Sequence, residues 1–336
     1  MNMYPTDCIQ NRKGDLLLVK YPPSKKNDPA YSNFRSVVFD KDSLVSVSPS
    51  KSISYESFKQ KYPFSECRVE EFVEGTMINA WYGNEKWNIS TRTILDATCY
   101  FESTKSFAEM FYECINNDPI ELNSEYCYSF VMQHPENVII TPVTKMKLIV
   151  VGRYKIREGV AVEYPDYPTL QVQSYEEAEA LAQTVAGKGL MLKCNGERAK
   201  IKRTAYYELE QLKGNSPFQH KYLFIRNTPE AILFLNTFPW YSSQAVTMEN
   251  EIQQISKMFY EAYVMYYIRK QPMPVGFPYK KMLYEIHFEY KMMRPARMTQ
   301  KKVNLMVNQL HPYQLTALLR VWKTAPITPS PPGMIL

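Results

Sequence analysis

Short hydrophobic runs bounded by turn-forming residues predict that the first two thirds of the chain is rich in β-strands. In 76–82 the apolar residues fall on both faces of the expected strand, which favours a sheet packed on both sides. Asn195-Gly196 separates two such runs and predicts a β-hairpin over 189–203. The other strands are expected at 35–40, 44–49, 75–83, 86–93, 127–133, 137–143 and 147–156.

Two segments within this strand-rich region show the spacing of amphipathic helices instead. The first is 103–117, for which Ser103 is the expected N-cap. The second is 174–187, where Ser174 and Glu177 have the spacing of a capping box and a glycine ends the segment. Helices are therefore interspersed among the strands.

The pattern changes after Gly214, where long helical periodicities replace the strands. Apolar residues recur at helical spacing in 247–270. Further helices are expected at 279–293, 299–310 and 312–322. We therefore predict an α+β fold, with an antiparallel-sheet domain over 1–214, an all-helical domain over 215–325 and a Pro-rich tail over 326–336.

The charge is distributed unevenly between these two parts. Residues 1–214 carry 26 Lys or Arg and 28 Asp or Glu, whereas residues 215–336 carry 14 and 6. The net charge of +6 therefore belongs to the helical part. Such asymmetry indicates binding to nucleic acid or another anionic surface, although a solvated basic face would give the same count.

Several classes of protein are excluded by what the sequence lacks. The N-terminus has no apolar stretch typical of a secretory signal, and no run of 18 apolar residues predicts a membrane span. The six cysteines form no CxxC pair, and the four histidines stand alone, so neither a zinc site nor a disulfide framework is predicted. We expect no metal site, no membrane partner and an intracellular, cytoplasmic location.

Several segments, taken in order, resemble the nucleotidyltransferase core of the covalent ligases, and in particular the phage T4-type RNA ligase family. The resemblance covers about residues 30–215 and extends to ligase-like proteins of large DNA viruses. It therefore implies a ligase core of the ATP-grasp-like kind and, for a viral protein, a place in the host cytoplasm or a viral factory. The segments are FRSVVFD (34–40), VSVSPSKSISYESF (45–58), EEFVEGTMINAWYGNEKWNISTRT (70–93), CYSFVMQHPENVII (127–140), KLIVVGRYKI (147–156) and GKGLMLKCNGERAKIKR (187–203).

In that family a lysine attacks the α-phosphate of ATP and forms a covalent lysyl-AMP, which splits one difficult transfer into two easier steps. The resemblance implies that the AMP then passes to an RNA 5′-phosphate, which is joined to a 3′-hydroxyl. Mg²⁺ and further lysines neutralise the phosphates. ATP and Mg²⁺ are therefore the cofactors expected if any activity remains.

Three positions depart from the family pattern. The nucleophilic lysine position is occupied by Phe72, which has no nucleophilic atom. The glutamate of the third motif is replaced by Ser129, and the metal-associated glutamate of the fourth motif by Lys188. The resemblance therefore implies a protein whose catalytic motifs are degenerate.

Other positions keep the expected residue types. Glu74 and Gly75 follow Phe72, and Arg92 lies in the second strand of the 75–93 hairpin. Lys200 and Lys202 match the phosphate-binding lysines of the fifth motif. These five residues are the predicted nucleotide-binding residues. Four of them have an alternative role: Glu74 could cap a turn, Arg92 could lie on the polar face of a hairpin, and the two lysines could lie on a solvated strand face. An arginine before the first strands is matched by Arg35.

The basic helical part offers a candidate RNA surface. Its predicted contacts are Lys291, Arg294, Arg297, Lys301 and Lys302. Each phosphate contact would add a salt-dependent contribution to binding. The aromatic segment 258–268 could stack bases, but a helical row of Tyr and Phe is more often part of a core.

Three functional hypotheses follow from the sequence. In the first, the protein binds a nucleotide or an RNA end without covalent chemistry, and the helical part positions RNA. In the second, it is an active ATP-dependent RNA ligase that uses a relocated lysine such as Lys51 or Lys86. In the third, it is a structural or interaction module with no ligand in the groove.

Overall fold

The structure, a computed structural model, describes residues 4–165, 168–273 and 279–324. The chain divides into two compact units between Lys213 and Gly214, called unit 1 and unit 2 below. The predicted tail at 326–336 lies outside the described residues.

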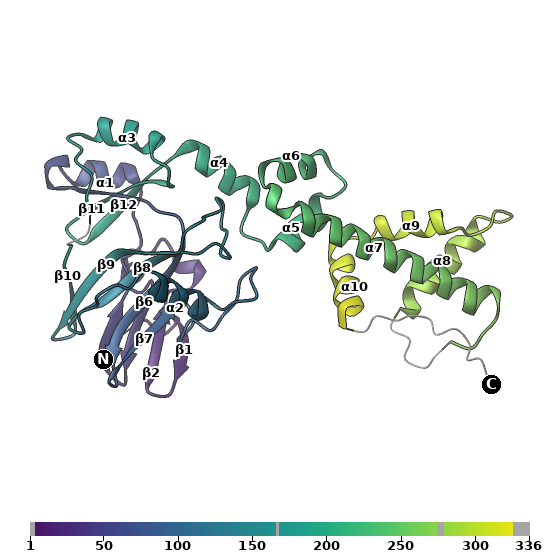
Figure 1. Ribbon diagram of the computed structural model, residues 1–336, viewed down its shortest axis with the longest axis horizontal. Helices are drawn as coiled ribbons and strands as arrows, with labels where there is room; N and C mark the ends of the chain where they lie inside the picture. The colour runs from purple at the N-terminus through teal and green to yellow at the C-terminus, as the bar shows by residue number, and fades with distance from the viewer. Residues whose placement is uncertain (1–3, 166–167, 274–278, 325–336) are drawn as a thin grey trace. The chain divides into compact units, whose positions relative to one another are not determined.

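Three antiparallel sheets make up the strands of unit 1 (Figure 1). The N-terminal sheet has the order β1-β2-β3-β4, the central sheet β10-β9-β8-β6-β7 and the small sheet β12-β11-β5. The strands are β1 (Ile9–Lys13), β2 (Leu16–Lys20), β3 (Val37–Asp40), β4 (Ser43–Val47), β5 (Arg68–Glu71), β6 (Thr76–Gly83), β7 (Lys86–Thr91), β8 (Cys127–Gln133), β9 (Lys147–Arg157), β10 (Val160–Glu163), β11 (Gly189–Cys194) and β12 (Glu197–Lys202).

The central sheet is covered on both faces, as the residues of β6 predict. On one face Ile78 and Phe130 pack against Met110 of helix α2 (Phe107–Asn117). On the other face Trp81 packs with Leu18 of the N-terminal sheet. Because neighbouring residues of β6 serve opposite cores, the apolar residues on both faces of this strand are explained.

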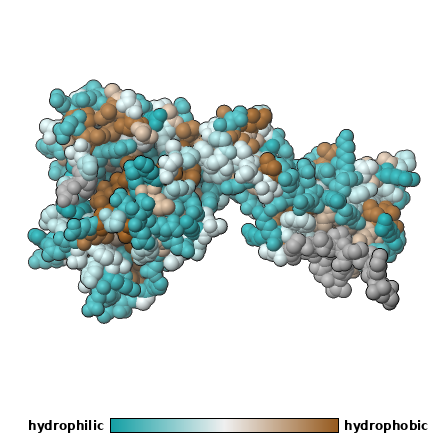
Figure 2. All heavy atoms as spheres, in the orientation of Figure 1, coloured by the Kyte–Doolittle hydropathy of each residue, from teal (hydrophilic) through white to brown (hydrophobic). Residues whose placement is uncertain are grey.

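Two helices cover one face of the small sheet. Phe58 of α1 (Tyr55–Lys61) and Ala178 of α3 (Tyr175–Thr184) are buried against Leu190. The opposite face of the same strands carries charged side chains, because residues alternate between the faces of a strand. Figure 2 shows hydrophobic residues between the layer that carries α3 and the strands of the central sheet.

The described residues of unit 2 form helices joined by turns and loops, and the longest helix is α7. Ile252, Ile255 and Phe259 of α7 are buried. The helix continues into one turn of π-helix, η5 (Val264–Ile268). The helices from the end of unit 1 onward are α4 (Thr204–Lys213), α5 (Phe218–Ile225), α6 (Pro229–Thr237), α7 (Ser242–Tyr263), α8 (Lys280–Met292), α9 (Gln300–Asn308) and α10 (Pro312–Thr324).

The α+β class with antiparallel sheets followed by helices is therefore confirmed. The predicted hairpin at 189–203 is formed by β11 and β12, with Asn195 and Gly196 at positive φ in its turn. Ser174 accepts a hydrogen bond from the backbone amide of Glu177, as the capping pattern predicts. Among the described residues, no helix has the length and apolar character needed to cross a membrane.

Two local predictions are wrong. The predicted strand at 137–143 is a loop, because the amides of Ile140 and Thr141 donate to the side chain of Glu74 rather than to a neighbouring strand. The N-cap of α2 is Ser106 rather than Ser103, since Ser106 forms a reciprocal capping box with Glu109.

A candidate anion site around Phe72

Backbone pairing fixes the position of Phe72 at the end of the small sheet. The amide of Phe72 donates to the carbonyl of Gly189 at 2.9 Å, and its carbonyl accepts from the amide of Lys188 at 2.8 Å. These bonds continue the β5–β11 ladder by one residue. Residue 72 is therefore held beside the start of β11.

The ring of Phe72 lies against two lysine ammonium groups. The Nζ atoms of Lys188 and Lys200 are 5.0 and 4.7 Å from its centroid. Both distances are within the range of cation–π attraction. Phe72 thus occupies the predicted nucleophile position, and two ammonium groups lie against its ring.

Lys200 is half-buried in a positive environment. Burial, together with the surrounding cations, lowers the pKa of its amine to about 7. Among the residues that the structure describes, Lys200 has neither an ion pair nor a hydrogen bond. The four cations that act on it are Arg198, Arg35, Lys188 and Lys202. We call these four residues and Lys200 the cation cluster.

Lys188 and Lys202 share one carboxylate. Glu210 of α4 lies 3.3 Å from the Nζ of Lys188 and 4.0 Å from that of Lys202. Lys188 also lies 5.2 Å from the ring of Tyr206, and its side chain is largely buried. Within the described parts of the chain, no group of three His, Cys, Asp or Glu could hold a metal ion. The cation cluster therefore does not fit a divalent cation.

Arg35 joins the cluster from the N-terminal sheet side. Burial and the charges of Arg198 and Arg92 lower the pKa of its guanidinium to about 9. Arg35 and Arg198 both donate to the carbonyl of Pro49, at 3.4 and 3.5 Å. Arg92 itself is exposed at the edge of the group. Lys200 and Lys202, the predicted phosphate contacts, thus lie in one cluster with Arg35, the predicted lead-in arginine. Arg198, which was not predicted from the sequence, belongs to the same cluster.

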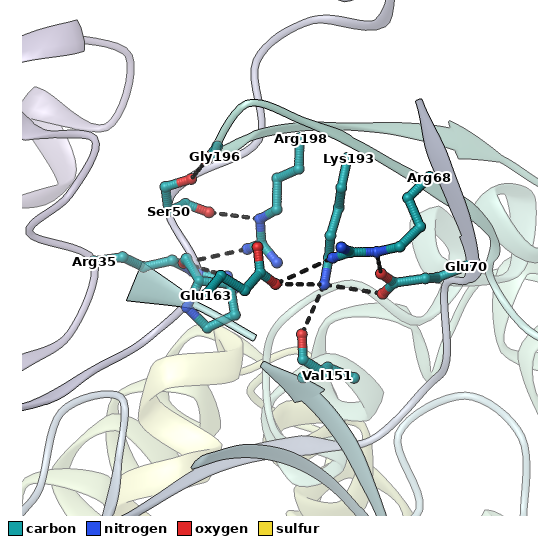
Figure 3. A network of polar contacts seen from close by, with 10 residues as sticks. Arg35, Ser50, Arg68, Glu70, Val151, Glu163, Lys193, Gly196 and Arg198 are labelled. Carbon is teal, nitrogen blue, oxygen red and sulfur yellow. Dashed lines mark hydrogen bonds and ion pairs between the residues drawn. The ribbon is translucent and has the colours of Figure 1, made fainter. Parts of the chain in front are cut away.

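A buried network of charges lies beside the cation cluster and connects the small and central sheets (Figure 3). Lys193 of β11 contacts Glu70 at 2.9 Å, Glu163 at 3.2 Å and the carbonyl of Val151 at 2.9 Å. Arg68 bonds the same two carboxylates, at 2.7 and 3.3 Å. Burial lowers the pKa of Lys193, although Glu70 and Glu163 act in the opposite direction. The Arg68–Glu70–Lys193–Glu163 network therefore fixes how the two sheets face each other.

A cavity of about 630 Å³ adjoins the same network. Its walls combine apolar side chains of β3, β4 and β10 with polar groups of β12. Arg198 lines it and donates to the carbonyl of Ser50 at 2.6 Å (Figure 3). The cavity is in the size range of small-molecule sites. Arg198 thus belongs to both the cavity and the cation cluster.

Glu74 lies outside the cation cluster. Its carboxylate is buried and anchors the 140–141 loop by accepting two backbone hydrogen bonds, so it has the turn-capping role that the sequence left open. Gly75 has a φ of +152°, and a Cβ there would meet the carbonyl oxygen of Met132 at 2.5 Å. Both residues serve the packing of the loop and of β6 against β8.

Ser129, for which the resemblance predicts a glutamate position, is fully buried in the central sheet. Its hydroxyl donates to Asn79 at 2.7 Å, and the amide of Asn79 donates to the hydroxyl of Ser36 at 3.3 Å. Ser129, Asn79 and Ser36 thus form a neutral chain of hydrogen bonds inside unit 1. Of the two alternative lysines, Lys51 donates to Asn27 at 2.9 Å, and burial together with the charges of Lys26 and Arg35 lowers its pKa. Lys86 is exposed at the start of β7.

The five predicted RNA contacts of unit 2 lie on and between α8 and α9. Lys302 pairs with Glu289 at 2.9 Å, and Arg294 lies 5.2 Å from the ring of Tyr290. Lys291, Arg297 and Lys301 are exposed. One of the five charges is therefore already paired.

Arg198, Lys193 and the acidic partners of Lys193 were not predicted from the sequence. The available signal was the alternation in ERAKIK, which places Arg198, Lys200 and Lys202 on one face of β12. Glu70 and Lys193 gave no local signal, because their pairing depends on the contact between β5 and β11.

No protein-family model matches the chain, and no curated protein matches it in sequence. Its structure is similar to that of a putative ATP-dependent DNA ligase from Aquifex aeolicus, with a TM-score of 0.43 and 16% identity over 70% of this chain and 69% of that one. An archaeal ATP-dependent RNA ligase gives a TM-score of 0.38 with 9% identity, over 92% of this chain and 74% of the other. A Naegleria gruberi RNA ligase gives 0.33 with 11% identity, over 43% of this chain and about half (51%) of that protein.

Proposed function

We propose that this chain is a ligase-like protein of the nucleotidyltransferase type that binds phosphates without forming lysyl-AMP. In this proposal the cation cluster of unit 1 holds the phosphates of a nucleotide or of an RNA 5′ end. The basic helices of unit 2 hold the RNA. The ligand class is thus a phosphorylated nucleotide end.

One observation carries the proposal. Lys200 is a half-buried amine, surrounded by cations and with no acidic partner among the described residues. Burying a charge is costly unless the charge is paired. Without an acidic partner, the amine of Lys200 therefore has a lowered pKa and loses its proton more readily than an exposed lysine. A phosphate placed between Lys200, Lys188 and Arg35 would supply the missing negative charge.

The loss of covalent chemistry is supported by the side chain at position 72. Phe72 has no nucleophilic atom, and Lys51 and Lys86 do not lie against its ring. Because attack requires a nucleophile in line with the phosphorus, a lysine in another part of unit 1 does not substitute for it. Magnesium has no carboxylate set in the cation cluster, since Glu210 pairs with two lysines.

A nucleotide fits the site better than a bare phosphate does. The cavity beside Arg198 has the volume for a nucleoside, and its walls are partly apolar. We therefore expect ATP or GTP to bind more tightly than pyrophosphate.

The test uses the full chain and two readouts. Incubation with α-labelled ATP or GTP and Mg²⁺ or Mn²⁺, followed by denaturing electrophoresis, reports covalent transfer. Calorimetric titration with ATP and pyrophosphate reports non-covalent binding. Lys200→Ala should weaken both ligands at least tenfold, whereas Lys155→Ala, which removes an ion pair with Glu125 on the surface, should not.

Each outcome separates the hypotheses. Binding without a covalent label supports the proposal. A label that survives denaturation would overturn it in favour of an active ligase. Absence of binding to both ligands would overturn it in favour of an interaction module.

A further inference from the structure

Helix α8 presents apolar side chains on its exposed face. Tyr284, Phe288 and Met292 are 57%, 64% and 71% exposed. Their spacing of four residues places them on one side of the helix, and we call them the α8 stripe. The opposite side of α8 is the buried one, with Leu283 and Ile286 fully enclosed. A surface helix would ordinarily carry polar residues where the α8 stripe lies.

Lysines flank the α8 stripe. Lys280 and Lys281 lie in the first turn of α8, and Lys291 lies in its last turn. All three are exposed, and the Nζ of Lys280 is 6.0 Å from the ring of Tyr284. In the described part of unit 2, none of the three has a carboxylate partner. The positive charge beside the rings is therefore available to a ligand.

The aromatic surface continues onto the π-helical turn η5. Tyr267 of η5 lies 6.3 Å from the ring of Tyr284 and 4.4 Å from that of His287. Burial lowers the pKa of His287, and the charges of Lys291, Lys270 and Arg294 lower it in the same direction. Lys270, Lys291 and Arg294 thus place three positive charges near His287 and the neighbouring rings.

We propose that the α8 stripe is a stacking platform for unpaired nucleotides of a single strand. The bases would stack on Tyr284 and Phe288, because every base has a π face that an exposed ring can cover. The phosphates would lie on the flanking cations, which are Lys270, Lys280, Lys281, Lys291 and Arg294. The inference rests on the proposed RNA partner and specifies its form, since paired bases cannot stack on a side chain.

The charges favour this occupant over a protein or a lipid surface. The flanking cations Lys270, Lys280, Lys281, Lys291 and Arg294 outnumber the acidic side chains of α8, which favours a polyanion. The acidic residues of α8 are Glu285 and Glu289, and Glu289 is paired with Lys302. Two of the three exposed apolar side chains are aromatic rings rather than aliphatic groups, which matches base stacking.

The experiment measures binding of the full chain to fluorescein-labelled U12 RNA and to a 12-base-pair RNA duplex by anisotropy. The Tyr284→Ala/Phe288→Ala variant should lose roughly tenfold or more in affinity for the single strand, because each stacked base contributes measurably to binding. It should keep its affinity for the duplex. Tyr284→Phe should bind the single strand like the wild type, because the π face is retained.

The matched control removes a different pair of exposed apolar side chains in unit 2. Ile232 and Leu233 of α6 are 67% and 57% exposed, and Ile232→Ala/Leu233→Ala should leave single-strand binding unchanged. Thermal unfolding of each variant checks that it is folded. A U12 DNA analogue with deoxyribose should bind comparably, since stacking and phosphate contacts do not need the 2′-hydroxyl.

Three results would overturn the proposal. The first is equal single-strand affinity of the wild type and the Tyr284→Ala/Phe288→Ala variant. The second is an equal loss for single strand and duplex. The third is a change of oligomeric state in that variant without a change in RNA affinity, which would assign the α8 stripe to a second copy of the chain. None of these results bears on nucleotide binding by Lys200, which the titrations of unit 1 test separately.

Discussion

At the scale of single residues, Phe72 is a neutral ring that two lysines share. An attraction between an ammonium group and an aromatic face stabilises by about 0.5–2 kcal/mol, depending on how far it is desolvated. Lys188 has a further partner in Glu210, whereas Lys200 has none among the described residues. The same ring thus stands at the predicted nucleophile position and helps to hold a lysine that has no acidic partner among the described residues.

Restoring the lysine at position 72 should not restore chemistry. Phe72→Lys places a third ammonium group beside Lys188 and Lys200, and like charges at this distance disfavour one another. The buried hydroxyl of Ser129 still offers no carboxylate. We expect no covalent label from α-labelled ATP and a lower melting temperature. Phe72→Leu is the control, and strong labelling of Phe72→Lys would show that the remaining residues suffice for transfer.

Anion binding by the cation cluster should depend on pH through Lys200. Its pKa in the folded protein is about 7, so near neutral pH the amine is partly unprotonated. A bound phosphate stabilises the charged form, and binding therefore takes up a proton. The affinity of the wild type for pyrophosphate should fall as the pH rises from 6 to 8. The Lys200→Arg variant keeps its charge over this range, so its pH dependence measures the effect of pyrophosphate's own ionisation, and the fall in the wild type should exceed it. Calorimetry in buffers of different ionisation enthalpy would detect the proton uptake, and its absence would contradict the assignment to Lys200.

The same shift has a consequence for stability. A lysine whose folded pKa is lowered binds fewer protons in the native than in the unfolded state, between about pH 7 and its ordinary value near 10.4. Stability should therefore rise with pH through this window because of Lys200. Lys200→Met should melt at a higher temperature than the wild type at pH 7 and show less of this rise. A lower melting temperature for Lys200→Met would mean that the amine has a stabilising partner.

At the scale of elements, the strands that carry continuous apolar runs could be predicted from the sequence. Strand β8 has the predicted bounds, and β6, β7 and β9 differ by one or two residues at their ends. Strands β1, β2, β5 and β10 were not predicted. β5 is short and charged, and it is a strand only because β11 pairs with it. The loop at 137–143 shows the converse, since its apolar residues satisfy the strand pattern while a distant side chain takes its amides.

The candidate site divides in the same way. Lys200 and Lys202 could be found because they alternate along one strand, and Arg35 because a resemblance placed it. Arg198 lies on the same face of β12, but its role depends on the carbonyls of Pro49 and Ser50 far along the chain. Local sequence carries periodicity and turn chemistry, whereas contacts across sheets depend on the assembled fold.

The buried network between the sheets should be sensitive to the loss of its central lysine. Lys193 and Glu70 are 7% and 6% exposed, and Lys193→Met would leave the carboxylates of Glu70 and Glu163 with Arg68 as their remaining cation in the network. Removing one partner of a buried pair costs about 3–5 kcal/mol. Urea unfolding should show a loss of that order for Lys193→Met. Lys155→Met removes an exposed pair and should cost about 1 kcal/mol or less. If Lys193→Met and Lys155→Met lost the same free energy of unfolding, Lys193 would not be the residue that holds the two sheets together.

At the scale of the whole molecule, the two units differ in charge rather than only in fold. Residues 1–214 carry slightly more acidic than basic residues, yet five of their cations form the cation cluster, and two of these lie against Phe72. Residues 215–336 carry 14 basic and 6 acidic residues, and the exposed cations of α8 and α9 are mostly unpaired among the described residues. A compact anion in unit 1 and an extended polyanion on unit 2 are the ligands that these distributions favour.

The salt dependence of RNA binding should report on the five cations predicted in unit 2. Each phosphate contact that is lost should make the plot of log affinity against log salt shallower by about 0.7 for a single strand. Because Lys302 is already paired with Glu289, we expect neutralising all five to reduce the slope by about 3 rather than by the full sum. The five are Lys291, Arg294, Arg297, Lys301 and Lys302.

A charge-matched control separates this surface from the effect of net charge. Five lysines that already have carboxylate partners are changed to glutamine, which lowers the net charge of the chain by the same amount. These lysines are Lys59, Lys61, Lys105, Lys155 and Lys221. If the salt slope fell equally in both variants, RNA would be held by the overall charge of the molecule. Only contacts that displace condensed ions from phosphates change the slope. A fall confined to the variant that neutralises the five cations of α8 and α9 would therefore mean that the RNA phosphates contact this surface.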